Sequence, residues 1–301
     1  MRITNSITAR SQFEGLAANM AALLKAQTQA TTGKRIQVAS DDPTASVQIM
    51  NSDSSLRALD QYRTNVQRAS SRVDQEDSVL QQMGDLLSRA KELGASQATA
   101  TASDQTRSVA NAEVQQIFQE IAALGNTKFG NEFLFGGEQS QTAPFTTTGS
   151  GATLDYTATA SQGTRSVAIG AGQTMAIAHD GKQLLLDSGV LDAVKQLSHA
   201  MDPASPTYGQ TGIGNAITSL NSSFNSVQSL VGDVGAKGLQ LNNAQQNLDA
   251  YKTNLTTFAS DLSEINVEQA VTEMTNRQVA YQAAMLATNK VMSLNLADYL
   301  K

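Results

Sequence analysis

The chain has 301 residues and a formal net charge of -6, with 40% hydrophobic and 5% aromatic residues, no cysteine and no tryptophan. The acidic balance argues against a nucleic acid as partner, and the lack of cysteine excludes disulfides, thiolate metal sites and thiol nucleophiles. No apolar run reaches the ~18 residues needed to cross a bilayer, so we expect no membrane insertion.

The first expected helix belongs to residues 1–32. Its apolar side chains recur in steps of three and four, which places them on one stripe of a helix. That stripe consists of Phe13, Leu16, Met20 and Leu23. Gly33 then supplies a helix stop, and Asp41-Asp42-Pro43 supplies an N-cap followed by proline at the first position of a new helix. Residues 33–42 are therefore expected to form a connector.

Two further helices are expected before residue 130. Apolar residues keep the same spacing from Leu59 to Leu87 and again from Ala110 to Leu124. The Ala-, Thr- and Ser-rich stretch 95–103 indicates a loop between them, with Asp104 as the expected cap of the third helix. These stripes are narrow, about two apolar positions in seven, which is typical of helices that pack on other helices.

Residues 137–186 differ in character from the rest of the chain. Gly, Thr and Ser are frequent, and short alternating runs occur at 153–157 and 167–169. This pattern predicts a small, turn-rich β module on the outer surface, where sequence changes are tolerated. A short helix is expected at Val190–Met201, and the helical pattern resumes near Ile213.

The C-terminal part is again helical, with apolar stripes from Leu241 to Ile265 and from Val271 to Tyr299. The predicted fold is mainly α with a small β insert: a long coiled-coil-like helical rod, with both termini together and the β domain at the far end. The predicted domains are a terminal helical assembly domain of residues 1–40 and 265–301, a helical bundle rod domain of 41–136 and 187–264, and an outer β domain of 137–186.

The apolar stripes at the two chain ends fit two arrangements that periodicity alone does not separate. They pair within the chain, or they form a seam that a neighbouring subunit covers. Because these seams are narrow and rich in Met, a helix that depends on a partner is about as well supported as an intramolecular pair, and both arrangements stay open on periodicity alone. The predicted subunit interface consists of Leu16, Met20, Leu23, Val271, Met274, Tyr281, Met285, Met292 and Tyr299.

The ionisable residues offer no recognisable catalytic set. The two histidines, His179 and His199, lie in different segments, so we interpret them as surface residues and not as a metal pair. The carboxylates at 41–42 and at 74–77 are expected to serve as a helix cap and as a solvated helix face.

Two glycine pairs, Gly170-Ala171-Gly172 and Gly212-Ile213-Gly214, complete neither the dinucleotide-binding fingerprint nor the P-loop pattern. We interpret both as turns. The sequence therefore predicts no catalytic residue, no cofactor and no metal, and hence no enzyme.

Several segments together resemble the flagellin family, and within it the junction proteins that lie between hook and filament. The similarity covers the helical parts of the chain and leaves the β insert without a close match. The segments that carry it are Met1–Thr4, Thr32–Ile36, Ser40–Pro43, Asn126–Gly137, Pro144–Phe145 and Ala287–Leu300.

This resemblance implies a structural subunit of the bacterial flagellum that is secreted unfolded through type III export and polymerises through its terminal helices. It implies that the subunit binds copies of itself, a first junction protein and flagellin. It also implies that an export chaperone binds the subunit before secretion. The absence of cysteine and the low aromatic content suit a chain that stays unfolded in transit.

Two alternatives remain at this point. Flagellin itself shares the terminal helices and differs mainly in the 126–145 segment and the C-terminal ending. A cytoplasmic coiled-coil signalling module would share the Ala-, Ser-, Thr- and Gln-rich heptads, but the β insert and the break at Gly33 argue against one continuous helical hairpin.

Overall fold

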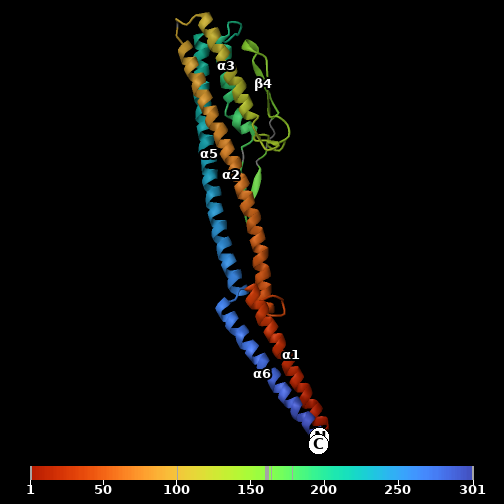
Figure 1. The fold of residues 1–301 in the computed structure, drawn as a ribbon. Helices are drawn as coiled ribbons and strands as arrows, with labels where there is room; N and C mark the ends of the chain where they lie inside the picture. Colours follow the sequence, from red (N-terminus) through yellow and green to blue (C-terminus); the bar gives the residue numbers. More distant parts are fainter. Residues whose placement is uncertain (1, 100, 160–162, 164, 178, 300–301) are drawn as a thin grey trace. The chain divides into compact units, whose positions relative to one another are not determined.

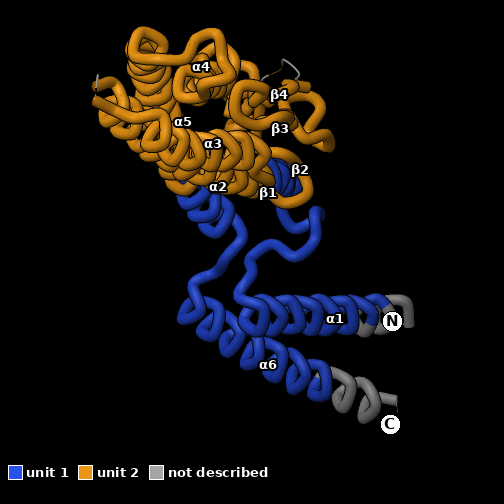
Figure 2. Tube along the Cα trace, turned by 90° about the horizontal axis from the view of Figure 1, so that it is seen from above, with its two compact units in different colours: residues 1–58, 251–301 blue, residues 59–250 orange. Residues whose placement is uncertain are grey.

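The computed structural model describes residues 2–99, 101–159, 163, 165–177 and 179–299, with side chains at residue 7 and from 10 to 290. The chain forms two compact units. Unit 1 contains residues 1–58 and 251–301, and unit 2 contains residues 59–250 (Figure 2). Both units draw on the same two long helices, α2 (Pro43–Gln97) and α5 (Gln210–Ser263).

Unit 1 is built around the two terminal helices, α1 (Arg2–Thr32) and α6 (Val267–Tyr299), which pack side by side (Figure 1). Helix α1 ends at Gly33, whose φ of 69° lies in the left-handed region that a residue with a side chain rarely adopts. The expected helix stop at this glycine is therefore confirmed.

The connector 33–42 is hydrogen-bonded to the turn between α5 and α6. The amide of Ile265 donates to the carbonyl of Gly33 at 2.9 Å, and the amide of Arg35 donates to the carbonyl of Ser263 at 2.7 Å. Lys34 and Glu264 form an isolated antiparallel bridge in the same place. These backbone bonds hold the ends of α1 and α6 together, although more than 200 residues separate them in the sequence.

Helix α2 starts as the sequence predicted. Asp42 is its cap, because its Oδ1 accepts a hydrogen bond of 3.0 Å from the amide of Ala45, and Pro43 occupies the first helical position. Asn266 caps α6 in the same way, accepting from the amide of Glu268 at 2.9 Å.

In unit 2, α2 and α5 run antiparallel along each other. Arg63 forms an ion pair with Asp249 at 2.5 Å, and Gly94 lies so close to Ile217 that a Cβ would be 3.1 Å from its side chain. A later residue of α2 thus lies beside an earlier residue of α5, as expected for antiparallel helices. The buried core side chains of these two helices include Val66, Val73, Leu80, Met83, Leu87, Val227, Val234 and Leu241.

Two shorter helices, α3 (Asp104–Gly125) and α4 (Val190–Met201), pack against each other in the same unit. Helix α4 has the bounds that the sequence predicted. The expected cap of α3 was wrong: Ser103 is the N-cap and accepts from the amide of Thr106, whereas Asp104 is the first helical residue. The interpretation of Gly212–Gly214 as a turn was also wrong, because these residues lie in the first turns of α5.

The β structure consists of three antiparallel hairpins within the described residues: β1 (Lys128–Phe129) with β2 (Glu132–Phe133), β3 (Phe145–Thr148) with β4 (Asp155–Ala158), and β5 (Ser166–Gly170) with β6 (Gln173–Ala176). Residues 171–172 form the turn of the last hairpin, as predicted for that glycine pair. A 3₁₀ turn (Gly151–Thr153) and a π-helical turn (Lys182–Asp187) complete the insert.

The insert supplies core to unit 2 as well as surface. Phe145, Leu154, Leu184 and Leu185 are almost completely buried. Gly125 of α3 has no space for a side chain, because a Cβ there would lie 2.5 Å from Leu185 and 2.9 Å from Phe145. Residues 137–186 are therefore packed onto α3.

The predicted fold class, mainly α with long terminal helices and a small β insert, is confirmed. The predicted domain limits at residues 40, 136, 187 and 264 stay a prediction beside the two compact units, whose limits fall at residues 58 and 251. Among the described residues, no helix combines the length and the apolar character that a bilayer crossing requires.

Candidate functional site

Exposed apolar side chains are concentrated in unit 1. Of the sixteen large hydrophobic side chains that are exposed in the described part of the chain, fourteen belong to unit 1, and the other two are Val109 and Leu239. The buried apolar residues show the opposite distribution. Among the described side chains, unit 1 contributes only Leu23, Ala26, Ile36, Ala45 and Ala270 to them. The described part of unit 1 thus lacks a closed hydrophobic core, which unit 2 possesses.

The two terminal helices carry much of this exposed apolar surface. Between 40% and 72% of the surface of these side chains is accessible. They are Ile7, Phe13, Met20 and Leu24 on α1, and Val267, Val271, Val279, Met285 and Leu286 on α6. Exposed apolar side chains that gather on one part of a soluble protein usually mark a contact with another protein. The α1–α6 pair is therefore the candidate functional site.

The predicted interface residues fall into four groups. Leu23 is buried within unit 1, and Leu16, Met274 and Tyr281 are half-buried. Met20, Val271 and Met285 are exposed. Met292 and Tyr299 lie on α6, but their side chains are outside the described part. The predicted stripe therefore contains both positions enclosed within the helix pair and positions open to a neighbour, and its role as a subunit interface stays a prediction.

A charged cluster holds the connector 33–42 in shape beside the helix pair. The Lys25 ammonium lies 2.7 Å from Oδ1 of Asp41, and the amides of Gln37 and Val38 donate to Oδ2 of Asp41. The hydrogen bond from Lys25, followed by the two backbone donors, lowers the pKa of Asp41 to about 2. A backbone donor from Ala45 and then Arg35 likewise lower the pKa of Asp42.

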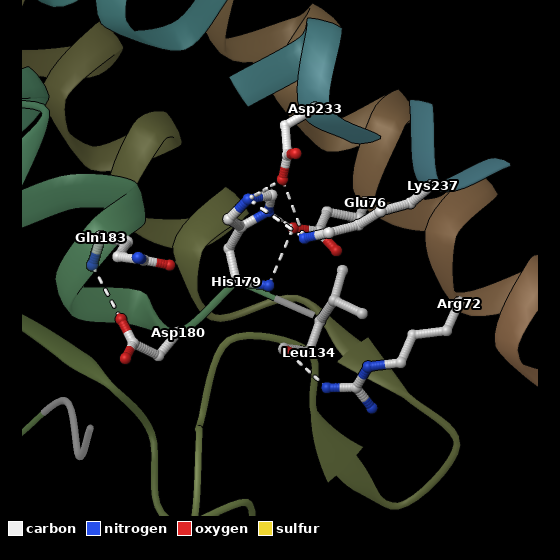
Figure 3. Close-up of polar contacts among 8 residues, drawn as sticks. All are labelled: Arg72, Glu76, Leu134, His179, Asp180, Gln183, Asp233 and Lys237. Atoms are coloured by element: carbon white, nitrogen blue, oxygen red, sulfur yellow. Dashed lines mark hydrogen bonds and ion pairs between the residues drawn. The ribbon is translucent and has the colours of Figure 1, made fainter. Parts of the chain in front are cut away.

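A second feature, a buried polar cluster in unit 2, joins three segments that are far apart in the sequence. Nδ1 of His179 lies 2.5 Å from Oε1 of Glu76 on α2, and its Nε2 lies 2.8 Å from Oδ2 of Asp233 on α5 (Figure 3). Lys237 is 2.9 Å from the same Asp233 oxygen and lowers the pKa of Asp233. Glu76 is fully buried, and His179 is 7% exposed.

The sequence interpretation of His179 and Glu76 was therefore wrong. His179 is a buried residue and not a surface one, and Glu76 does not lie on a solvated helix face. The two residues are separated by 103 positions, so no local pattern reveals their pairing. One signal was available: position 76 falls on the same helical face as the core residues Val73 and Leu80. His199 is half-buried and contacts the carbonyl of Leu154 at 3.1 Å.

We interpret this cluster as structural and not as catalytic. The amine of Lys237 lies 3.3 Å from Nε2 of His179, but it is paired with Asp233 at 2.9 Å, and no hydroxyl is among the described hydrogen-bond partners of the imidazole. In the described part of the chain, no group of His, Asp and Glu has an arrangement that could hold a metal ion. The arrangement fastens the segment after β6 to α2 and α5.

Two family models match the chain at its two ends. The model of the bacterial flagellin N-terminal helical region matches residues 3–140, and the model of the bacterial flagellin C-terminal helical region matches residues 214–300. The two models describe two regions of flagellin, and together they match well over half of the chain. The chain belongs to the flagellin family.

Named relatives include hook-associated proteins and a flagellin. Flagellar hook-associated protein 3 of Escherichia coli K12 is 30% identical over 146 residues, 48% of this chain and 46% of the relative. Its counterpart in Salmonella typhimurium is 29% identical over 187 residues, 61% of this chain and 56% of the relative. The chain thus spans about half the length of these two relatives. A flagellin of Halalkalibacterium halodurans is 23% identical over 290 residues, 95% of each chain.

Solved structures share the fold. Flagellar hook-associated protein 3 from Legionella pneumophila aligns with a TM-score of 0.63 at 13% identity, covering 71% of this chain and 98% of that one. At this identity the likeness concerns the fold alone.

Proposed function

We propose that this chain is a structural subunit of the bacterial flagellum that forms the junction between hook and filament. It contacts a first junction protein on one side and flagellin on the other, and it polymerises through α1 and α6. The observation that carries the proposal is the distribution of apolar surface. The two matched helical regions include α1 and α6, and this helix pair leaves apolar side chains exposed to solvent.

The physical argument rests on what α1 and α6 lack. Two helices in contact enclose one narrow seam, so each helix still exposes the rest of its apolar stripe unless further helices pack around the pair. Burying apolar surface contributes a favourable free energy of about 25 cal/mol per Å². Side chains that are exposed in the monomer therefore stabilise an assembly that buries them. A ring or tube of such pairs supplies the missing neighbours.

A junction subunit is favoured over a filament subunit by the relatives named hook-associated protein 3, which are more identical to the chain than the flagellin is. Flagellin remains the alternative, since its match extends over 95% of both chains. The signalling-module alternative lacks support of this kind.

The remaining parts of the proposal concern the route to the flagellum. The subunit is exported unfolded, kept assembly-incompetent by a chaperone that covers the terminal helices, and secreted to the hook-filament junction. It acts without cofactor, metal or catalysis.

Substitution of Met285 by Asp tests the interface. Met285 is 40% exposed, so Met285→Asp leaves the thermal melt of the monomer nearly unchanged. In an assembly, the same carboxylate faces a neighbouring helix, where an unpaired buried charge costs several kcal/mol. We expect cells that export the variant to carry hooks without filaments, as seen by electron microscopy.

The matched control is Gln282→Asp, which places the same charge on an exposed position of the same helix, off the predicted stripe. This variant should assemble. Normal filaments on cells that export Met285→Asp would show that α6 does not use this stripe for assembly.

Position along the flagellum separates the two candidate functions. Immunogold labelling should mark a narrow zone at the hook-filament boundary, and cells that lack the protein should release flagellin into the medium. Label along the filament would instead identify a filament subunit.

A further inference from the structure

A basic cavity lies in unit 2. It has a volume of about 360 Å³ and lies between α2, the β1–β2 hairpin and the β5–β6 hairpin. Three arginines and one glutamate provide its charged lining, together with polar and apolar side chains. Residues at its wall include Asn65, Arg68, Arg72, Glu132, Arg165 and Val167.

Arg72 is the unusual member of this lining. Its side chain is only 7% exposed, and among the described residues it donates one hydrogen bond, from Nη2 to the carbonyl of Leu134 (Figure 3). Its Nε is buried and has no hydrogen-bond partner. A buried guanidinium with an unsatisfied donor is costly, because burial removes the hydration of a full charge. Burial, followed by the nearby charge of Arg165, lowers the pKa of Arg72.

The other two arginines of the lining differ in how their charge is compensated. Arg68 lies one helical turn before Arg72 on the same face of α2, and it has no hydrogen bond or ion pair to another described residue. Arg165 forms an ion pair with Glu132, which is the one carboxylate in the lining. The lining therefore carries three guanidinium groups and one carboxylate, an excess of two positive charges in the lining itself, while Glu76 is a further carboxylate near Arg72.

We propose that this cavity binds a small dianionic oxyanion, of the phosphate or dicarboxylate class. A dianion matches the excess charge, and the guanidinium fork is suited to the paired oxygens of phosphate and carboxylate groups. The bound anion connects α2 with the β5–β6 hairpin, because its three cationic partners come from α2 and from the segment before β5. Its role is to fasten the insert to the helices of unit 2.

Calorimetric titration of the full-length chain tests the site. Sodium phosphate and sodium malonate serve as the tetrahedral and the planar probe, in a sodium chloride background of constant ionic strength, because exposed charge interactions are screened by salt. Saturable binding of either probe with one site per chain is expected. Binding of neither probe overturns the proposal.

Two variants locate the binding. Arg68→Gln removes an exposed arginine at the cavity, and it should weaken binding about tenfold, ~1.4 kcal/mol, with little effect on folding. Arg57→Gln is the matched control, because it removes an exposed arginine from the same helix outside the cavity. Equal affinities of the two variants would refute the assignment. Arg72→Lys, which keeps the charge but loses the fork, should also weaken binding, and its folding is checked by circular dichroism.

Discussion

The buried pair of Glu76 and His179 makes a sharp prediction about stability. Replacing His179 by Leu removes the imidazole and leaves the Glu76 carboxylate fully buried. Among the described residues, its remaining hydrogen-bond donor is then the backbone amide of residue 179. The other carboxylate of the cluster is affected much less. Asp233 is half exposed and keeps its 2.9 Å contact with Lys237. The loss therefore arises at Glu76.

The expected magnitudes follow from burial. Leaving a buried carboxylate without its hydrogen-bonded partner costs about 3 to 5 kcal/mol, whereas losing a half-exposed pair costs about 0.5 kcal/mol. His179→Leu should therefore lower the free energy of unfolding by about 3 kcal/mol, and Asp233→Asn by about 0.5 kcal/mol. The double variant Glu76→Leu with His179→Leu should recover most of the loss, because replacing both partners by apolar groups is close to neutral.

Urea unfolding followed by circular dichroism measures these differences. With a slope of about 2 kcal/mol per M, the single His179→Leu variant should unfold at roughly 1.5 M less urea than the parent chain. Hydrogen exchange of the segment from Asp180 to Asp187 should locate the loss in unit 2. The reasoning would be refuted if the double variant showed the summed loss of its two single variants, or if His179→Leu were no more harmful than Asp233→Asn.

Three further predictions concern other parts of the chain. The pKa of Asp41 is lowered to about 2 from 3.8, so its contribution to the stability of the connector 33–42 is complete above pH 3.8 and is lost as the pH falls through about 2. Over this pH window the connector amides should lose protection from hydrogen exchange in the parent chain and not in Asp41→Asn. Limited proteolysis of the monomer should cut both terminal helices first and leave a fragment that contains residues 59–250, because unit 1 has few buried apolar residues; resistant ends would contradict this. Replacing residues 137–186 by a Gly/Ser linker should abolish cooperative unfolding of unit 2, since the insert supplies buried core side chains, and a retained sharp melt would show that the helices fold without it.

Much of the fold could be predicted because its signals are local. The Asp42-Pro43 start of α2, the stop at Gly33 and the bounds of α4 depend on residues within one or two helical turns, where capping and backbone conformation act. The β insert was found for the same reason, since alternation and glycine content are properties of a short segment. The shortest hairpin, β1–β2, has strands of two residues, too short to show any alternation.

Local reasoning was wrong at the starts of two helices, α3 and α5. At α3, two neighbouring residues compete for the N-cap position. Ser103 and Asp104 are both good caps, and the serine takes the position because its side chain reaches the amide of Thr106. Gly212 and Gly214 have a turn-like composition, yet they are helical in α5. There Gly212 is required by space, because a Cβ would lie 1.9 Å from the carbonyl oxygen of Thr207.

The sequence by itself determined the class of the protein: its helical ends, its β insert and the segments that resemble flagellins. The tertiary structure decided which polar groups are buried together. Glu76 and His179 meet across 103 residues, and the arginines of the basic cavity come from α2 and from the segment before β5. Periodicity reports which face of a helix is apolar, but it does not report what lies against that face. Burial and charge pairing depend on that second element, and so they emerge only when the chain is folded.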